Sequence, residues 1–173
     1  MTRSKFPLSQ VYTVLEPGAV VLIGSRLGDK INLMPISWKT MLDFDPPIVG
    51  CCIGDHSYTF GMVKKSKEFT MNIPAAGLLK NVYASGQVSG RAVDKFNKFG
   101  FTAVPGSKVK APLIKECFIN LECKVVNAQL VDKYNFFVVK VVAAWIDRAA
   151  KHAHAVRHIS GKKFMIDGKT VSI

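Results

Sequence analysis

The sequence is poor in acidic residues and in long apolar runs. Its 12 Asp and Glu stand against 24 Lys and Arg, which leaves a formal net charge of +12. The longest apolar stretch, 136–146, is interrupted by Lys140 and is shorter than the roughly 18 residues that a membrane-spanning helix needs. The opening segment MTRSKFPLSQ lacks the apolar centre of a signal peptide. We therefore expect a cytoplasmic protein with no membrane partner.

Cysteine is also scarce, and no CxxC pair occurs among Cys51, Cys52, Cys117 and Cys123. Cys51 and Cys52 are neighbours in an expected strand, so their side chains point to opposite faces and do not share a metal ion. His152 and His154 lie on one face of an extended segment, but no third ligand accompanies them. The sequence thus favours free thiols and no metal site.

The common nucleotide-binding and catalytic motifs are missing. The chain has no GxGxxG, no GxxxxGK[ST], no GxSxG and no HExxH. These absences exclude a Rossmann pyrophosphate loop, a Walker A loop, a hydrolase nucleophile elbow and a zinc-protease helix. Any nucleotide cofactor must therefore be held by a different arrangement.

The excess of basic residues favours anionic partners, and nucleic acid is the first to consider. The lysines are scattered along the chain, and no helix-turn-helix, zinc-finger or aromatic RNA-binding pattern accompanies them. We therefore expect no nucleic-acid partner and relate the charge to phosphorylated small molecules. A basic nucleic-acid-binding barrel stays open as an alternative.

The length of 173 residues suits a single domain over 1–173, and short apolar runs between turn residues predict that strands dominate it. Strands are expected at 20–25, 31–38, 48–53, 69–73, 119–130 and 136–146, with a last pair, 163–166 and 169–173. That pair is expected to turn at Asp167-Gly168, and the segment 27–30 predicts another hairpin turn.

Helical signals are fewer and gather between residues 57 and 100. Ser57 suits an N-cap of a helix to about Lys65, and Pro74 suits the first turn of a helix to about Ala84. A third helix is expected at 93–99, ended by Gly100. The whole pattern is typical of a β-barrel with a helical insertion.

Two segments carry groups that suit a phosphate. The helix start at His56-Ser57-Tyr58-Thr59 offers free backbone N–H groups and two hydroxyls, although Ser57 as a plain N-cap explains the pattern equally well. In Ser89-Gly90-Arg91, glycine allows close backbone approach. Arg91 and Lys95 would lie on one face of a helix, unless both are solvated surface cations.

The segment 32–39 predicts an irregular strand beside these groups, because Pro35 implies an edge position with free backbone groups. Alternation places Leu33 and Pro35 on one face, and Asn32, Met34, Ile36 and Trp38 on the other. An irregular strand with free backbone groups and an aromatic side chain beside it would suit a flavin ring. The alternative is that Trp38 is an ordinary core residue.

The order of these segments resembles the flavin reductase-like, FMN-binding split-barrel family, which includes flavoredoxin and NAD(P)H:flavin reductases. The blocks are NLMPISWxxxLDFDPPIV, HSYT, FTMNIP, SGRAVDKF and KAPLIKECFINLECKV, within residues 17–148. The end of the chain resembles the tail of a flavoredoxin-like subgroup. It departs from that pattern at Arg157-His158, where two histidines are common.

The resemblance implies a mainly β fold with short helices. It implies a six-stranded antiparallel split β-barrel, a helical insertion around 57–100, a homodimer and one FMN per subunit near the dimer interface. The cofactor-binding residues that it implies are Asn32, Met34, Pro35, Ile36, Ser37, Trp38, Lys39, Ser57, Tyr58, Thr59, Asn72, Ser89, Gly90, Arg91 and Lys95. His158 is a candidate neighbour of the flavin ring, and no other catalytic side chain is expected.

The main functional hypothesis is an NAD(P)H:FMN oxidoreductase, with NADH or NADPH as transient hydride donor and flavin N5 carrying the chemistry. A flavoredoxin-type FMN electron carrier, reduced by an acidic redox protein partner, is the alternative. The sequence does not distinguish NADH from NADPH, because it has no Rossmann acidic residue to inspect.

Overall fold

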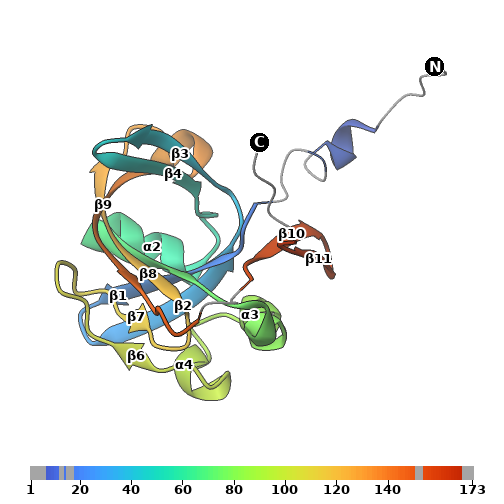
Figure 1. The fold of residues 1–173 in the computed structure, drawn as a ribbon. Coiled ribbons are helices and arrows are strands. Elements are labelled where there is room, and N and C mark those ends of the chain that lie inside the picture. Colours follow the sequence, from blue (N-terminus) through green and yellow to red (C-terminus); the bar gives the residue numbers. More distant parts are fainter. Residues whose placement is uncertain (1–6, 12–13, 15–17, 151–153, 169–173) are drawn as a thin grey trace.

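A computed structural model describes residues 7–11, 14, 18–150 and 154–168. Its main element is an antiparallel sheet of seven strands in the order β2-β1-β5-β8-β9-β4-β3. These strands are β1 (Val21–Leu27), β2 (Lys30–Ile36), β3 (Lys39–Phe44), β4 (Pro47–Cys52), β5 (Glu68–Ile73), β8 (Ile119–Asn127) and β9 (Phe136–Ile146). The sheet curls into a barrel (Figure 1), and in the described chain its edge strands β2 and β3 are not paired with each other. The predicted split barrel is confirmed.

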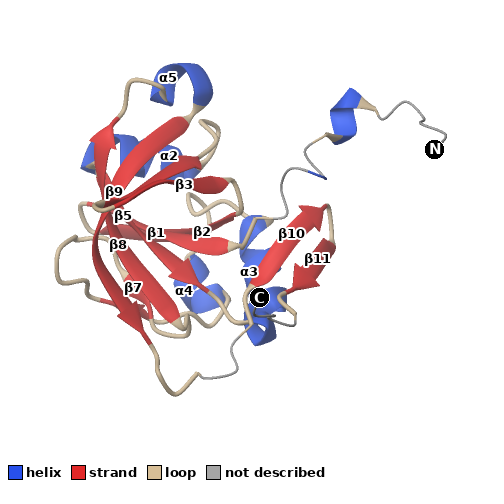
Figure 2. Ribbon diagram, turned by 45° about the horizontal axis from the view of Figure 1, so that its top comes forward, coloured by secondary structure: helices blue, strands red, loops and turns tan. Residues whose placement is uncertain are grey.

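Shorter elements surround this barrel. The helices are α2 (Tyr58–Ser66), α3 (Leu79–Gly86), α4 (Lys95–Lys98) and α5 (Val131–Tyr134), with 3-10 turns η1 (Leu8–Gln10) and η2 (Ala76–Leu78). Two small hairpin sheets are formed by β6 (Ala103–Val104) with β7 (Leu113–Ile114), and by β10 (Val156–Ser160) with β11 (Lys163–Ile166). The β10–β11 hairpin lies beside α3 at one side of the barrel (Figure 2). None of the described helices has the length and apolarity needed to cross a membrane.

Two apolar cores lie on opposite faces of the sheet, as the alternation along β1 requires. Val21 and Ile23 belong to the inner core, which α2 joins through Val63. Val20 and Leu22 belong to the outer core, which α3, α4 and the β10–β11 hairpin cover. The hairpin enters this outer core through the fully buried Val156. The outer core therefore holds α3, α4 and the terminal hairpin together, whereas α2 belongs to the inner core.

Several sequence-based predictions need correction in detail. The sheet has one strand more than the six expected, because β3 is an edge strand whose residues are mostly exposed and whose sequence lacks an apolar run. The helix expected from Pro74 begins only at Leu79, after η2. The structure shows a hairpin that was not expected, in which β10 and β11 are joined by a turn at Gly161 with a positive φ of 52°. The expected strand 169–173 lies outside the described residues.

The Glu122 carboxylate anchors the loop between β6 and β7 to the sheet. It accepts hydrogen bonds from the backbone N–H groups of Ser107 (3.0 Å), Lys108 (2.6 Å) and Val109 (2.9 Å). The indole N–H of Trp145 donates a further bond of 2.9 Å. Burial by itself raises the pKa of Glu122, but these donors outweigh it and lower the pKa to about 2. The loop is thus held by a buried, ionised carboxylate.

Candidate functional site

Three adjoining cavities run along β2 and the chain that follows it. The first, the α2 cavity, has a volume of about 230 Å³ and lies between the start of α2 and the segment before α4. The second, the α3 cavity, has about 260 Å³ and lies between α3, β2 and the β10–β11 hairpin. The third, the Trp38 cavity, has about 410 Å³. Neighbouring cavities share lining residues. The α2 and α3 cavities share Gly86 and Gln87, and the α2 and Trp38 cavities share His56. The α3 and Trp38 cavities share Ile36, Ser37 and His158.

The α2 cavity is built on the N-terminus of α2. The Ser57 hydroxyl caps this helix by accepting the Phe60 N–H at 3.0 Å. The buried Thr59 hydroxyl accepts the Asn32 side-chain N–H at 2.9 Å. The Asn32 Oδ1 atom is buried without a hydrogen-bond partner in the described structure. A Cβ atom at Gly90 would lie 2.0 Å from this Oδ1, so only glycine fits there.

Lys95 is the main cation of the α2 cavity. Its side chain is only 5% exposed, and no acceptor among the described residues is hydrogen-bonded to its ammonium group. Burial lowers the pKa of Lys95 to about 8, because the charged form loses hydration. Asn32 Oδ1 is the one fully buried side-chain polar atom without a partner among the described residues, so the Lys95 ammonium reaches the cavity, where a bound anion would pair with it.

Arg91 lies at the mouth of the same cavity rather than within it. It is exposed, its guanidinium lies 5.4 Å from the centre of the Tyr58 ring, and its Nη1 donates to the backbone oxygen of His56 at 3.5 Å. Arg91 and Lys95 do not share a helix, because α4 begins at Lys95. The predicted helical pairing is therefore wrong, although both cations lie near one cavity.

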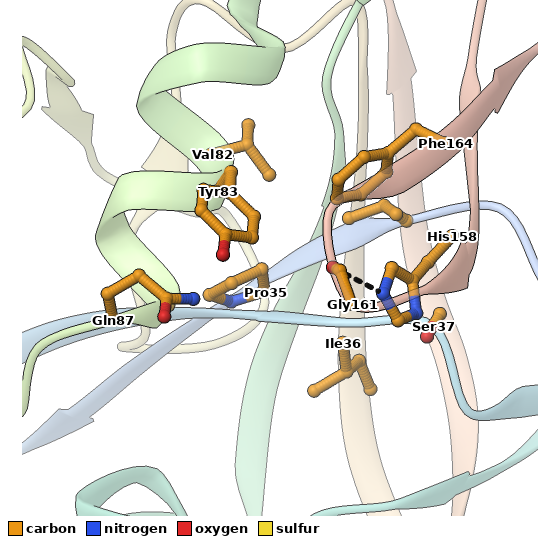
Figure 3. Close-up of a pocket in the computed structure, with 11 residues that line it drawn as sticks. Pro35, Ile36, Ser37, Val82, Tyr83, Gln87, His158, Gly161 and Phe164 are labelled. Carbon is orange, nitrogen blue, oxygen red and sulfur yellow. Dashed lines mark hydrogen bonds between the residues drawn. The ribbon is translucent and has the colours of Figure 1, made fainter.

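The α3 cavity is walled by three segments that are distant in sequence (Figure 3). Pro35, Ile36 and Ser37 come from β2 and its end, Val82, Tyr83 and Gln87 from α3 and its end, and His158, Gly161 and Phe164 from the hairpin. His158 Nε2 lies 3.2 Å from the backbone oxygen of Gly161. The Phe164 ring lies between the rings of His158, at 5.1 Å, and Tyr83, at 6.0 Å.

The Trp38 cavity exposes an aromatic side chain. Trp38 is 57% exposed and lines the cavity with Cys52, His56 and Tyr134, so it is not an ordinary core residue. Burial raises the pKa of the Cys52 thiol, which keeps it protonated. All four cysteines are free, and the described residues hold no cluster of three or more His, Cys, Asp or Glu that would bind a metal ion. His152 lies outside the described residues.

The structure brings most of the predicted cofactor residues to these cavities. The α2 cavity gathers Asn32, Met34, Ser57, Tyr58, Thr59, Ser89, Gly90 and Lys95, while Pro35, Ile36, Ser37, Trp38 and His158 line the other two.

Asn72, Lys39 and Arg91 are exceptions, because none of them lines any of the three cavities. The Asn72 amide is buried and bonded to Leu22, Thr70 and Ile114, among others, so its role in this structure is to hold strands together. The Lys39 ammonium donates to the backbone oxygen of Ala19.

Sequence reasoning missed the contribution of α3. Tyr83 and Gln87 are four residues apart, which is the helical spacing that puts two side chains on one face. Phe164 was missed because nothing in the sequence shows that the terminal hairpin packs against α3. The Tyr83–Gln87 spacing was the one available signal.

The described residues thus form an open antiparallel barrel with a lysine-lined cavity beside two further cavities, which defines its class of fold. Residues 15–162 match the flavin reductase like domain, and the chain belongs to this family. An uncharacterised protein of Pyrococcus abyssi is 37% identical over 76% of each chain. Flavoredoxin of Desulfovibrio vulgaris (Miyazaki F) superimposes with a TM-score of 0.88 at 21% identity, over 100% of this chain and 97% of its own. Flavoredoxin of Methanosarcina acetivorans superimposes with a TM-score of 0.81 at 26% identity, over 100% of this chain and 95% of its own.

Proposed function

We propose that this chain binds FMN, with its phosphate in the α2 cavity. The observation that carries this proposal is that Lys95, a largely buried residue, lines one cavity together with the N-terminus of α2 and that its ammonium donates to no acceptor among the described residues. A phosphate dianion would pair with this cation and accept the free N–H groups of the helix start. The absence of a Cβ at Gly90 lets the backbone there lie close against the Asn32 amide, which borders the same cavity.

The adjoining Trp38 cavity suits the flavin ring. Met34, Ile36 and Trp38 offer apolar and aromatic surface in and next to the α2 cavity, and β2 pairs with a single neighbour, β1, among the described strands. Ser57 and Thr59 would hold the phosphate together with Ser89 and Lys95. The residues present therefore fit the cofactor at both its anionic and its planar end.

We further propose that the activity is NAD(P)H:FMN oxidoreduction. Bound FMN supplies hydride acceptance and electron transfer, and the protein's task is to bind, orient and shield it. Thr59 and Asn32 form a preorganised polar pair beside the phosphate end, while Trp38 and His158 border the space next to the ring cavities. The flavoredoxin-type carrier remains the second candidate, which the net charge of +12 favours through docking of an acidic redox protein.

Two measurements on the purified protein test this function. Titration with FMN, followed by flavin fluorescence, is expected to give saturable one-to-one binding, and the complex is expected to oxidise NADH or NADPH in steady state. Saturable FMN binding without turnover of either nucleotide would support the electron carrier instead. A protein that binds no FMN would overturn both candidates and favour a barrel with another ligand.

FMN affinity is expected to depend on pH through Lys95. With a pKa of about 8, Lys95 is charged below that pH and neutral above it in the FMN-free protein. The bound phosphate favours the charged form, so binding takes up a proton above pH 8. We expect a Kd that is flat between pH 7 and 8 and then rises about tenfold per pH unit. A Kd measured by fluorescence titration that stays flat to pH 9.5 would contradict this assignment.

We also propose a homodimer that uses the edge strand β3. Its residues Met41, Leu42 and Phe44 are 52%, 50% and 87% exposed, which is unusual for a strand beside a cofactor site. An edge strand with apolar side chains readily pairs with a second copy. The strand follows Trp38 directly, so a second copy placed there would adjoin the Trp38 cavity.

Phe44→Glu is expected to convert this dimer into a monomer. The substitution puts a carboxylate into the apolar patch, so the mass measured by light scattering at micromolar concentration should halve. Val126→Glu is the matched control, because Val126 is an exposed apolar residue of β8, a strand that does not neighbour β3. Equal masses for the wild type and Phe44→Glu would contradict the use of this strand.

A further inference from the structure

The α3 cavity differs in chemistry from the α2 cavity beside it. Lys95 makes the α2 cavity cationic, whereas none of the eleven residues around the α3 cavity carries a permanent charge, and His158 is its one titratable imidazole. Its walls are apolar on three sides, formed by Pro35, Val82 and Phe164. Such a lining favours a neutral ligand and offers no partner to a phosphate or a carboxylate.

Two hydrogen-bonding side chains from α3 and its end face this apolar space. Tyr83 and Gln87 both line it, and Figure 3 shows both side chains extending from the α3 side of the cavity. Neither side chain makes a hydrogen bond to another residue in the part of the chain that the structure describes. Both are able to donate to the same acceptor oxygen, since a phenol and an amide each carry a donor.

The size of the cavity limits the ligand further. A volume of about 260 Å³ is at the lower end for organic ligands and suits one substituted six-membered ring rather than a dinucleotide. The Phe164 ring, in edge contact with Tyr83, forms a flat wall against which such a ring would pack. Ile36, Ser37 and His158 connect this space to the Trp38 cavity.

From this geometry we infer that the α3 cavity binds a neutral one-ring quinone as electron acceptor, with a carbonyl oxygen accepting from Tyr83 and Gln87. The inference rests on the proposed function for its reductant. NAD(P)H gives up a hydride, which carries two electrons and one proton. Bound FMN would relay these two electrons, and the hydride proton with one proton from solvent would complete the conversion of the two quinone carbonyls into hydroxyls. The products are NAD(P)⁺ and the hydroquinone. Tyr83 and Gln87 orient the acceptor and stabilise the charge on its oxygen.

Binding of duroquinone tests the site without turnover. This tetramethylated ring has no free ring position for thiols to attack, so its binding to oxidised protein is measurable by calorimetry with and without FMN and with no nicotinamide present. We expect saturable binding to the wild type, weakened about 5- to 10-fold by Tyr83→Phe and again by Gln87→Leu, because each removes one hydrogen bond. Tyr83→Phe keeps the ring that packs on Phe164, so the fold is retained. Lys80→Gln is the control on the same helix, at an exposed residue outside the cavity, and should bind like the wild type.

The outcomes separate the site from the proposed function. Absence of duroquinone binding, or equal binding by wild type and Tyr83→Phe, would overturn the site even if the protein oxidises NAD(P)H with FMN. Duroquinone binding that depends on Tyr83, in a protein that oxidises neither NADH nor NADPH, would support the site and overturn the reductase function. Weakening by Lys80→Gln equal to that by Tyr83→Phe would also overturn the site.

Discussion

Lys95→Met is expected to weaken FMN binding about 100-fold. The variant keeps the length of the side chain but removes the one buried cation of the α2 cavity, and with it a charge-assisted hydrogen bond worth about 2–3 kcal/mol. The flavin-free variant is expected to gain about 2 kcal/mol in the free energy of unfolding, because an unpaired buried charge is replaced by an apolar group. The two effects have opposite signs, as expected for a binding residue that lowers the stability of the empty fold.

Fluorescence titration and urea denaturation measure these two quantities. Lys98→Met is the matched control, because Lys98 belongs to the same short helix but is exposed. It should change neither value by more than about 0.5 kcal/mol. A Lys95→Met protein that binds FMN within threefold of the wild type would remove the basis for a phosphate in the α2 cavity.

Glu122→Gln is expected to destabilise the protein by about 3 kcal/mol at pH 7. The estimate follows from the fall of the carboxyl pKa from an ordinary 4.5 to about 2. A glutamine keeps the shape but turns an NH₂ group toward N–H donors of the 107–109 loop, which then lack an acceptor. Since FMN is not involved, this prediction holds whatever the function.

The sign of the pH dependence follows from the direction of the pKa change. A carboxyl whose pKa is lower in the folded protein contributes its full stability above about pH 4.5 and loses it as the pH falls toward 2. The wild type should therefore lose about 3 kcal/mol more than Glu122→Gln between pH 5 and 2, so that the two converge near pH 2. Glu116→Gln, whose carboxylate accepts a single backbone N–H from Thr102, should cost clearly less. Parallel stability curves for the wild type and Glu122→Gln would contradict the assigned pKa.

The sequence predicted those parts of the site that depend on local pattern. Pro35 indicated an edge strand, and β2 is one edge of the sheet. Ser57 indicated a helix start, and its hydroxyl caps α2. Both inferences use rules that involve only a few neighbouring residues, and for that reason they needed no knowledge of the tertiary fold.

The parts that failed depend on contacts between distant segments. Asn72 lies in a motif that suggested the cofactor, yet its amide bonds to Leu22 and Ile114, which are far from it in sequence. The packing of Phe164 against Tyr83 joins the terminal hairpin to α3, and no periodic pattern in the sequence predicts this contact. Burial of Lys95 was equally hidden, because a lysine next to Asp94 in a polar turn looks like a surface residue until the fold encloses it.

The attachment of the β10–β11 hairpin has a consequence for how such barrels diversify. The hairpin contributes one wall of the α3 cavity and is anchored in the outer core by Val156. The α2 cavity, in contrast, is lined only by residues that precede residue 96. On the function proposed above, exchanging this terminal module between relatives would change the ligand preference of the α3 cavity while leaving the α2 cavity, and with it phosphate binding, intact. The ligand preference of the α3 cavity and phosphate binding in the α2 cavity can therefore change separately in evolution. A chimaera joined at residue 154 would change them separately by design.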